Sequence, residues 1–196
     1  MPELVDLTNV FGESWCVTVT DMPLDAALEF MGVVESVVRP NGLAEVTGRL
    51  VASSSRADRQ TLLLGKETAG WTVVLELEGL IGWVGEEPGL LGDLSAGGGT
   101  ACTMRSSPNE VAVIFAEDGE VTSGLNAVNG WRWGTPSPRL AAALDAVGFT
   151  EGAAAETEAL SFAQCAALAV QAATGVELHA DTFQDGWSGG LTEPRS

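Results

Sequence analysis

The chain has 196 residues and a mass of 20.3 kDa, enough for one domain of ordinary size. Apolar residues make up 45% of it and charged residues 18%, which excludes a wholly disordered acidic chain. The formal net charge is −18, so nucleic acid and anionic membrane surfaces are not expected as direct ligands. A basic protein or a cation is the electrostatically matched partner.

The N-terminal segment and the cysteines both predict a cytoplasmic protein. Residues 1–15 carry three acids and no base, so they lack the positive and apolar regions of a secretory signal. The three cysteines form no CxxC pair, and their odd number fits reduced, buried thiols better than a disulfide framework. Residues 159–176 carry no charge, but their alanine-rich composition predicts a packed helix of a soluble protein rather than a membrane span.

A strand over residues 15–20 and a helix over residues 22–31 open the predicted fold. Asp21 stands where the N-cap of this helix belongs, Pro23 falls in its first turn, and Gly32 offers a left-handed stop. Apolar residues recur at helical spacing along it, so we expect one of its faces to be buried.

The middle of the chain predicts strands separated by turns. Short runs of β-branched and aromatic residues are bounded by glycine there, and the Asp118-Gly119 pair predicts a tight hairpin. Loops are expected at residues 53–58 and 82–92. The further predicted strands cover residues 43–52, 61–64, 71–77, 100–105, 110–116 and 121–125.

Two more helices are predicted near the C-terminus. The first covers residues 138–147, after an N-cap at Ser137. The second begins at a capping box formed by Ser161 and Gln164 and runs to about residue 174. Strands in the middle with helices at both ends predict an α+β fold: a mostly antiparallel sheet of about six strands with three helices packed on one face.

We expect a single domain over residues 1–187, a mobile tether at residues 150–156 and a flexible tail over residues 188–196. Residues 39–66 hold five bases and two acids, a local charge of +3 that leaves −21 for the remainder. This segment is either a small basic patch for an anionic group or, as we favour, a solvated face paired with the acidic remainder.

Established catalytic motifs are absent from the sequence, which contains no phosphate-binding loop, dinucleotide fingerprint, nucleophile elbow, zinc-protease motif or calcium loop. No cofactor is therefore predicted, and we lean against an enzyme. Glu76 and Glu78 would share one face of a strand, where a pair of catalytic carboxylates or, as we favour, a solvated face would account for them.

The only histidine, His179, excludes a metal site with several histidines. With Asp181 and Asp185 it is a weak candidate for a carboxylate-rich cation site. The alternative, which we favour, is a surface histidine near acidic residues.

The segment Trp131-Arg132-Trp133 is the most distinctive local feature and the candidate binding site. Two indoles beside a guanidinium form a platform of the kind found at interface hot spots. On an extended segment both indoles would point to one side and Arg132 to the other, so a structural pair packed under the helix over residues 138–147 is the favoured alternative.

Several segments together resemble a family of uncharacterised actinobacterial proteins described as a domain of unknown function. The resemblance implies a bacterial cytosolic protein with an α+β fold, and it supplies no catalytic residue, cofactor or substrate. The segments that carry it include Trp15-Cys16-Val17-Thr18-Val19, Gly70-Trp71-Thr72-Val73-Val74 and Arg132-Trp133-Gly134.

The leading hypothesis is a non-enzymatic acidic binding protein, of the immunity or inhibitor type, that neutralises a partner with a basic surface. One alternative is a small hydrolase or cation-dependent enzyme that uses His179 with neighbouring carboxylates, or Cys102 as nucleophile. Another is a structural or scaffolding subunit that self-associates through an apolar patch around Trp131 and Trp133.

Overall fold

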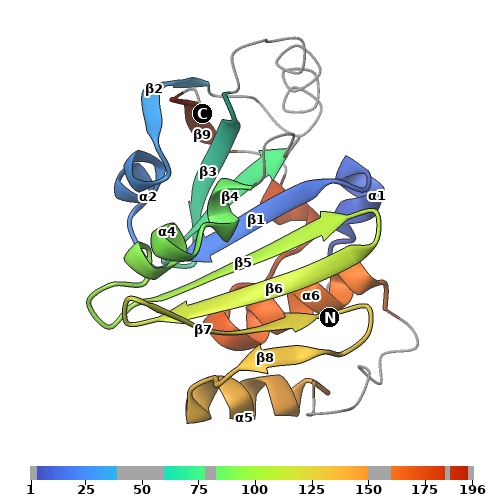
Figure 1. Cartoon of the computed structure of the whole chain (residues 1–196). Helices are drawn as coiled ribbons and strands as arrows, with labels where there is room; N and C mark the ends of the chain where they lie inside the picture. Colours follow the sequence, from blue (N-terminus) through green and yellow to red (C-terminus); the bar gives the residue numbers. More distant parts are fainter. Residues whose placement is uncertain (1–3, 39–59, 78–82, 150–159, 184–185, 194–196) are drawn as a thin grey trace.

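The computed structural model describes residues 4–38, 60–77, 83–149, 160–183 and 186–193, and one large antiparallel sheet dominates it (Figure 1). The strands are β1 (Trp15–Thr20), β2 (Val33–Val38), β3 (Leu62–Thr68), β4 (Trp71–Leu77), β5 (Thr100–Ser107), β6 (Glu110–Glu117), β7 (Glu120–Asn126), β8 (Arg132–Gly134) and β9 (Ser188–Thr192). They lie in the order β2-β9-β3-β4-β1-β5-β6-β7-β8, and each neighbouring pair is antiparallel. The last strand of the chain is therefore next to the edge strand β2.

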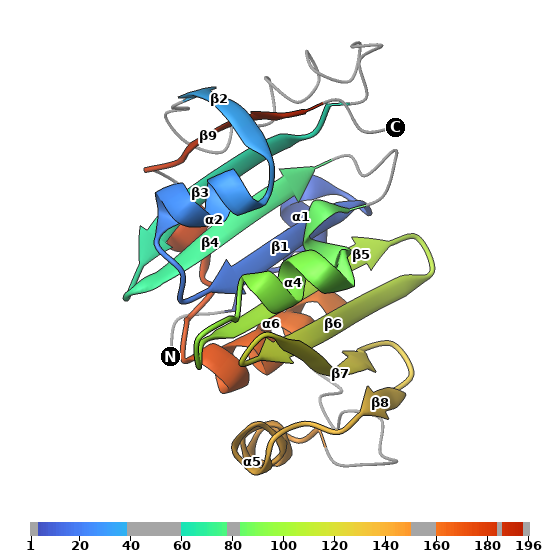
Figure 2. The ribbon, with the colours of Figure 1, turned by 60° about the vertical axis from the view of Figure 1, so that its left-hand side comes forward.

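Helices cover both faces of this sheet (Figure 2). One face carries α1 (Leu7–Phe11), α5 (Pro138–Ala146) and α6 (Phe162–Thr174), over the larger hydrophobic cluster. The other carries α2 (Leu24–Phe30), the short 3-10 helix η1 (Val84–Glu86) and α4 (Pro88–Asp93), over a smaller cluster. A second 3-10 helix, η2 (Ala180–Phe183), precedes β9. None of the described helices is long and apolar enough to cross a bilayer.

The expected sheet of about six strands with three helices on one face is wrong, because the sheet has nine strands and the described residues contain five α-helices on two faces. The helix expected over residues 22–31 is α2, and it lies on the face opposite α5 and α6. The loop expected at residues 82–92 contains η1 and most of α4. The strand at 43–52, the loop at 53–58 and the tether at 150–156 lie outside the described residues.

The expectation of a flexible tail over residues 188–196 also needs correction. Its first five residues form β9, which pairs with β2 on one side and β3 on the other. Glycine allows this pairing. A Cβ at Gly189 would lie 1.9 Å from the carbonyl oxygen of Leu63, so no other residue fits without moving the strands apart. The missing side chain of Gly189 is what lets the two backbones approach.

Other sequence predictions are confirmed. Strands β1 and β4 have the predicted bounds, and the Ser137 cap and the Ser161–Gln164 capping box stand at the starts of α5 and α6. The turn at Asp118 and Gly119 has φ values of 51° and 88°, as a tight hairpin requires. The expected N-cap at Asp21 is wrong, because the N-cap of α2 is Pro23. The Asp21 carboxylate instead accepts a hydrogen bond from the Thr100 backbone N–H at 3.2 Å.

Candidate functional site

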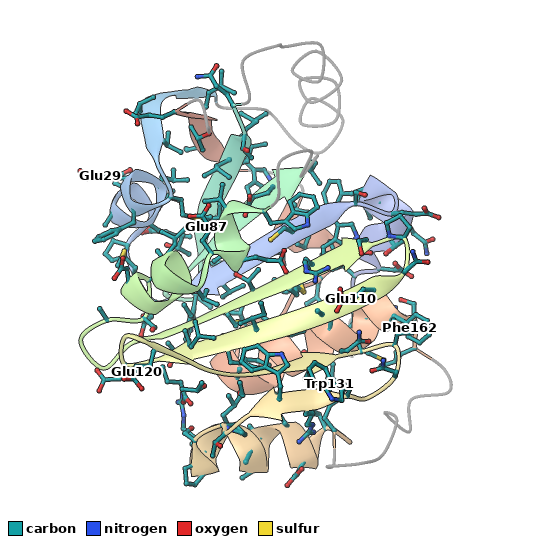
Figure 3. The ribbon with its side chains drawn as sticks, in the orientation of Figure 1. Glu29, Glu87, Glu110, Glu120, Trp131 and Phe162 are labelled. Atoms are coloured by element: carbon teal, nitrogen blue, oxygen red, sulfur yellow. The ribbon has the colours of Figure 1, made fainter. Side chains whose placement is uncertain are left out.

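A groove with a volume of about 540 Å³ lies at the β2 edge of the sheet. Its walls are the end of α2, the start of β2, the η1–α4 junction and the end of β9 with Glu193. We call it the acidic groove, because three exposed carboxylates, those of Glu29, Glu87 and Glu193, line it. Figure 3 shows Glu29 on α2 and Glu87 where α4 begins.

Apolar side chains lie among these carboxylates. Phe30 is 53% exposed and Val34 is 55% exposed, and both line the acidic groove, together with the half-buried Leu90. None of the described residues that line it is basic. The groove therefore offers an apolar surface inside a negatively charged rim, which suits a ligand that is both apolar and cationic.

Backbone hydrogen bonds set the position of the wall formed by α2 and β2. The Gly32 N–H donates to the Glu29 carbonyl at 2.9 Å, and Gly32 has a φ of +84°, the left-handed conformation that ends a helix. The Glu193 N–H donates to the Gly32 carbonyl at 3.1 Å, so the chain end after β9 is tied to the same turn. Two carboxylates separated by more than 160 positions in sequence thus reach one groove.

A buried carboxylate holds the opposite wall. Glu76 on β4 is fully buried, and its two oxygens accept hydrogen bonds from the backbone N–H groups of Val84 and Gly85, each at 2.8 Å. The favoured expectation of a solvated face for Glu76 is therefore wrong, while Glu78 lies outside the described residues. Glu76 is buried because the first backbone N–H groups of η1 need hydrogen-bond acceptors inside the protein.

Further polar contacts hold η1 against the sheet. The Thr103 hydroxyl donates to the Gly85 carbonyl at 2.8 Å and also contacts the Thr18 hydroxyl at 3.0 Å. A Cβ at Gly85 would lie 2.1 Å from the Thr18 Oγ1, so glycine is needed for this close approach. Arg105 pairs with Glu86, and its Nη2 donates to Glu110 at 2.7 Å. Side chains of two strands thus bind the η1 segment: Glu76 on β4, and Thr103 and Arg105 on β5.

Burial raises the pKa of two titratable groups close to η1. Burial, with the negative charges of Glu76 and Glu86 added, raises the pKa of the Cys16 thiol well above its ordinary value. Burial also raises the pKa of Glu86, against the opposing effect of Arg105. On the same sheet, burial raises the pKa of the Cys102 thiol, which is fully covered. A covered thiol with a raised pKa is a poor nucleophile, so the geometry gives no support to Cys102 as a catalytic residue.

The predicted binding segment lies at the other end of the sheet. Trp131 is 61% exposed just before β8, and Figure 3 shows it beside this strand. The Trp133 indole lies over Gly124, which pairs with Trp133 across β7 and β8. The Arg132 Nη1 approaches the Asp145 Oδ1 on α5 at 3.9 Å. Strand alternation thus sets Arg132, not the indole of Trp133, on the side of α5.

His179 forms a local contact rather than a metal site. Its Nε2 lies 2.9 Å from the Glu177 Oε2, and its backbone bridges to Leu4. Asp181 lies in η2, and Asp185 lies outside the described residues. Within the described ranges, no group of three or more His, Cys, Asp or Glu residues is arranged to hold a metal ion.

Sequence reasoning missed the acidic groove, since Glu29, Glu87 and Glu193 are remote from one another along the chain. The overall charge was the only sequence signal that pointed toward it.

Comparison with protein-family models places the chain in a family. Residues 5–187 match the model of the family of unknown function DUF6461, so the chain belongs to this family. Searches among curated proteins and among solved structures gave no match.

Proposed function

We propose that this member of the DUF6461 family is a non-enzymatic binding protein whose acidic groove docks a basic segment of a protein partner. The observation that carries the proposal is the placement of three exposed carboxylates around Phe30 and Val34 in one groove. The net charge of −18 supports it, because it attracts a basic partner from a distance.

The two kinds of side chain have different roles in this docking. An apolar residue of the partner covers Phe30 and Val34, and this burial supplies most of the affinity. Lysine or arginine residues on either side of it meet Glu29, Glu87 and Glu193. Exposed ion pairs of this kind contribute only about 0.2–1 kcal/mol each, but they speed the encounter and select against acidic partners.

The form of this function that we propose is an inhibitor or immunity-type protein, which neutralises a basic partner by covering its surface. We also propose a cytoplasmic location and an actinobacterial source. The location is supported by the buried, free thiols of Cys16 and Cys102, and the source by the resemblance of the sequence segments described above.

Direct binding of a designed peptide tests the proposal. The probe is a fluorescent peptide of alternating lysine and leucine, and fluorescence anisotropy is followed at low and at high salt. We expect saturable binding that salt weakens. The variant Glu29→Gln/Glu87→Gln/Glu193→Gln should bind about tenfold more weakly, because it loses three exposed ion pairs.

A matched variant separates the groove from the overall charge. Glu13→Gln/Asp93→Asn/Glu120→Gln removes the same three charges from exposed positions that do not line the acidic groove. It should bind the peptide as the wild type does. Equal weakening by both triple variants, or no saturable binding to the wild type, would overturn the proposal.

A further inference from the structure

A second groove, of about 450 Å³, lies between β7–β8 and α5, far along the sheet from the acidic groove. We call it the β8–α5 groove. Its volume is in the range of small-molecule sites. Figure 1 shows α5 beyond the β8 edge of the sheet, at the opposite end from β2.

Two buried polar atoms in the lining of this groove have no hydrogen-bond partner among the described residues. They are the Ser123 Oγ and the Arg132 Nη2, each with less than 1 Å² of exposed surface. Ser123 as a whole is only 4% exposed. Buried polar groups in proteins nearly always have partners, so two such atoms in one groove indicate a ligand that supplies acceptors.

Strand register sets both side chains toward α5. Ser123 pairs with Phe115 and Arg132 pairs with Leu125, and both apolar partners belong to the hydrophobic cluster under α5 and α6. Residues paired across neighbouring strands share a face, so Ser123 and Arg132 lie on the α5 side as diagonal neighbours. One ligand group can therefore face the hydroxyl and the guanidinium together.

Arg132 is held by a weak contact. Its ion pair with Asp145 joins the Nη1 and Oδ1 atoms at 3.9 Å, longer than a direct hydrogen bond, and the Asp145 side chain is 55% exposed. The guanidinium thus keeps donors for a second acceptor. The rest of the lining includes the apolar side chains of Phe115, Leu125 and Leu144.

We propose that the β8–α5 groove binds a small organic carboxylate with an apolar body. Arg132 and Ser123 hold the carboxylate, since a guanidinium matches its two oxygens, and the apolar body lies against Leu125 and Leu144. A singly charged group fits better than a phosphate, because Arg132 is the only basic residue in the described lining and Asp145 lies beside it. This site is independent of the acidic groove.

Calorimetric titration with the straight-chain carboxylates from butanoate to decanoate tests this site, and the amide of each acid serves as the uncharged control. We expect saturable one-to-one binding of at least one acid, with its amide about tenfold weaker. Arg132→Gln should weaken binding about tenfold, and Ser123→Ala should weaken it severalfold.

Arg139→Gln is the matched control, because Arg139 is exposed near the start of α5 and does not line the groove. It should bind as the wild type does, and circular dichroism checks that every variant is folded. The proposal is overturned by an absence of binding for the whole series, by equal affinity for acid and amide, or by equal effects of Arg132→Gln and Arg139→Gln. If Arg132→Gln does not fold, Ser123→Ala and the amides decide the question.

Discussion

Replacing Glu76 by Gln should destabilise the protein and loosen one wall of the acidic groove. The carboxylate accepts from two backbone N–H groups of η1, and both bonds are buried. Gln has the same shape but only one acceptor oxygen. The second N–H would lose its acceptor and face the amide NH2 group of the new side chain.

The magnitude follows from these two bonds. A hydrogen bond to a buried charged group contributes about 1.5–3 kcal/mol, and a buried donor left without an acceptor costs about 1–3 kcal/mol. Glu76→Gln keeps one bond in a weaker, neutral form, so we expect a loss of about 3 kcal/mol in the free energy of unfolding. For a chain of this length each kcal/mol lowers Tm by about 2–4 °C, so the expected fall is about 6–12 °C.

Urea titration followed by tryptophan fluorescence measures the free energy, and calorimetry measures Tm. Glu120→Gln is the control, because Glu120 is exposed and its replacement should change the free energy of unfolding by less than about 0.5 kcal/mol. A loss below about 1 kcal/mol for Glu76→Gln would refute the assigned role of this carboxylate. Peptide binding should also weaken, since Val84 and Glu87 line the groove next to the loosened segment.

Two further predictions concern the sheet. Burial raises the pKa of Cys16 and Cys102 above the ordinary thiol value of 9.0, so the unfolded chain ionises first and stability falls as pH rises above about 9. Each thiol contributes a slope of about 1.4 kcal/mol per pH unit, and urea titrations across this range should show a slope smaller by that amount for Cys102→Ala; an unchanged slope would contradict the pKa shift. Gly189→Ala should cost at least about 3 kcal/mol in the same titrations, because its Cβ would meet the Leu63 carbonyl oxygen, whereas Gly89→Ala, with open space around its Cβ, should be nearly neutral. A neutral Gly189→Ala would show that β9 is not paired with β3.

The sequence predicted best those elements whose signals are local. The helices α5 and α6 begin at side-chain caps that the sequence shows directly, and β1 and β4 are continuous runs buried on both faces or nearly so. Prediction from the sequence failed for α4 and β9. In both elements a glycine allows close contact with backbone atoms that are distant in the sequence. A Cβ at Gly92 would lie 2.6 Å from the Gly119 carbonyl oxygen, which no pattern within α4 reveals.

The acidic groove could not be predicted from the sequence for a similar reason. Its carboxylates come from α2, the start of α4 and the end of β9, and only the sheet order brings them together. Net charge predicted the class of partner but not the place. The binding role of the segment Trp131-Arg132-Trp133 stays a prediction. Strand alternation divides its side chains, since Arg132 approaches Asp145 on α5 while the Trp133 indole covers Gly124.

Hydrogen–deuterium exchange with and without the lysine–leucine peptide tests the central claim most directly. The docking account predicts slower exchange over residues 24–38 and 83–93, which form two walls of the acidic groove, and no change at residues 131–146. Protection confined to β8 and α5, or protection absent from both walls, would contradict docking in the acidic groove.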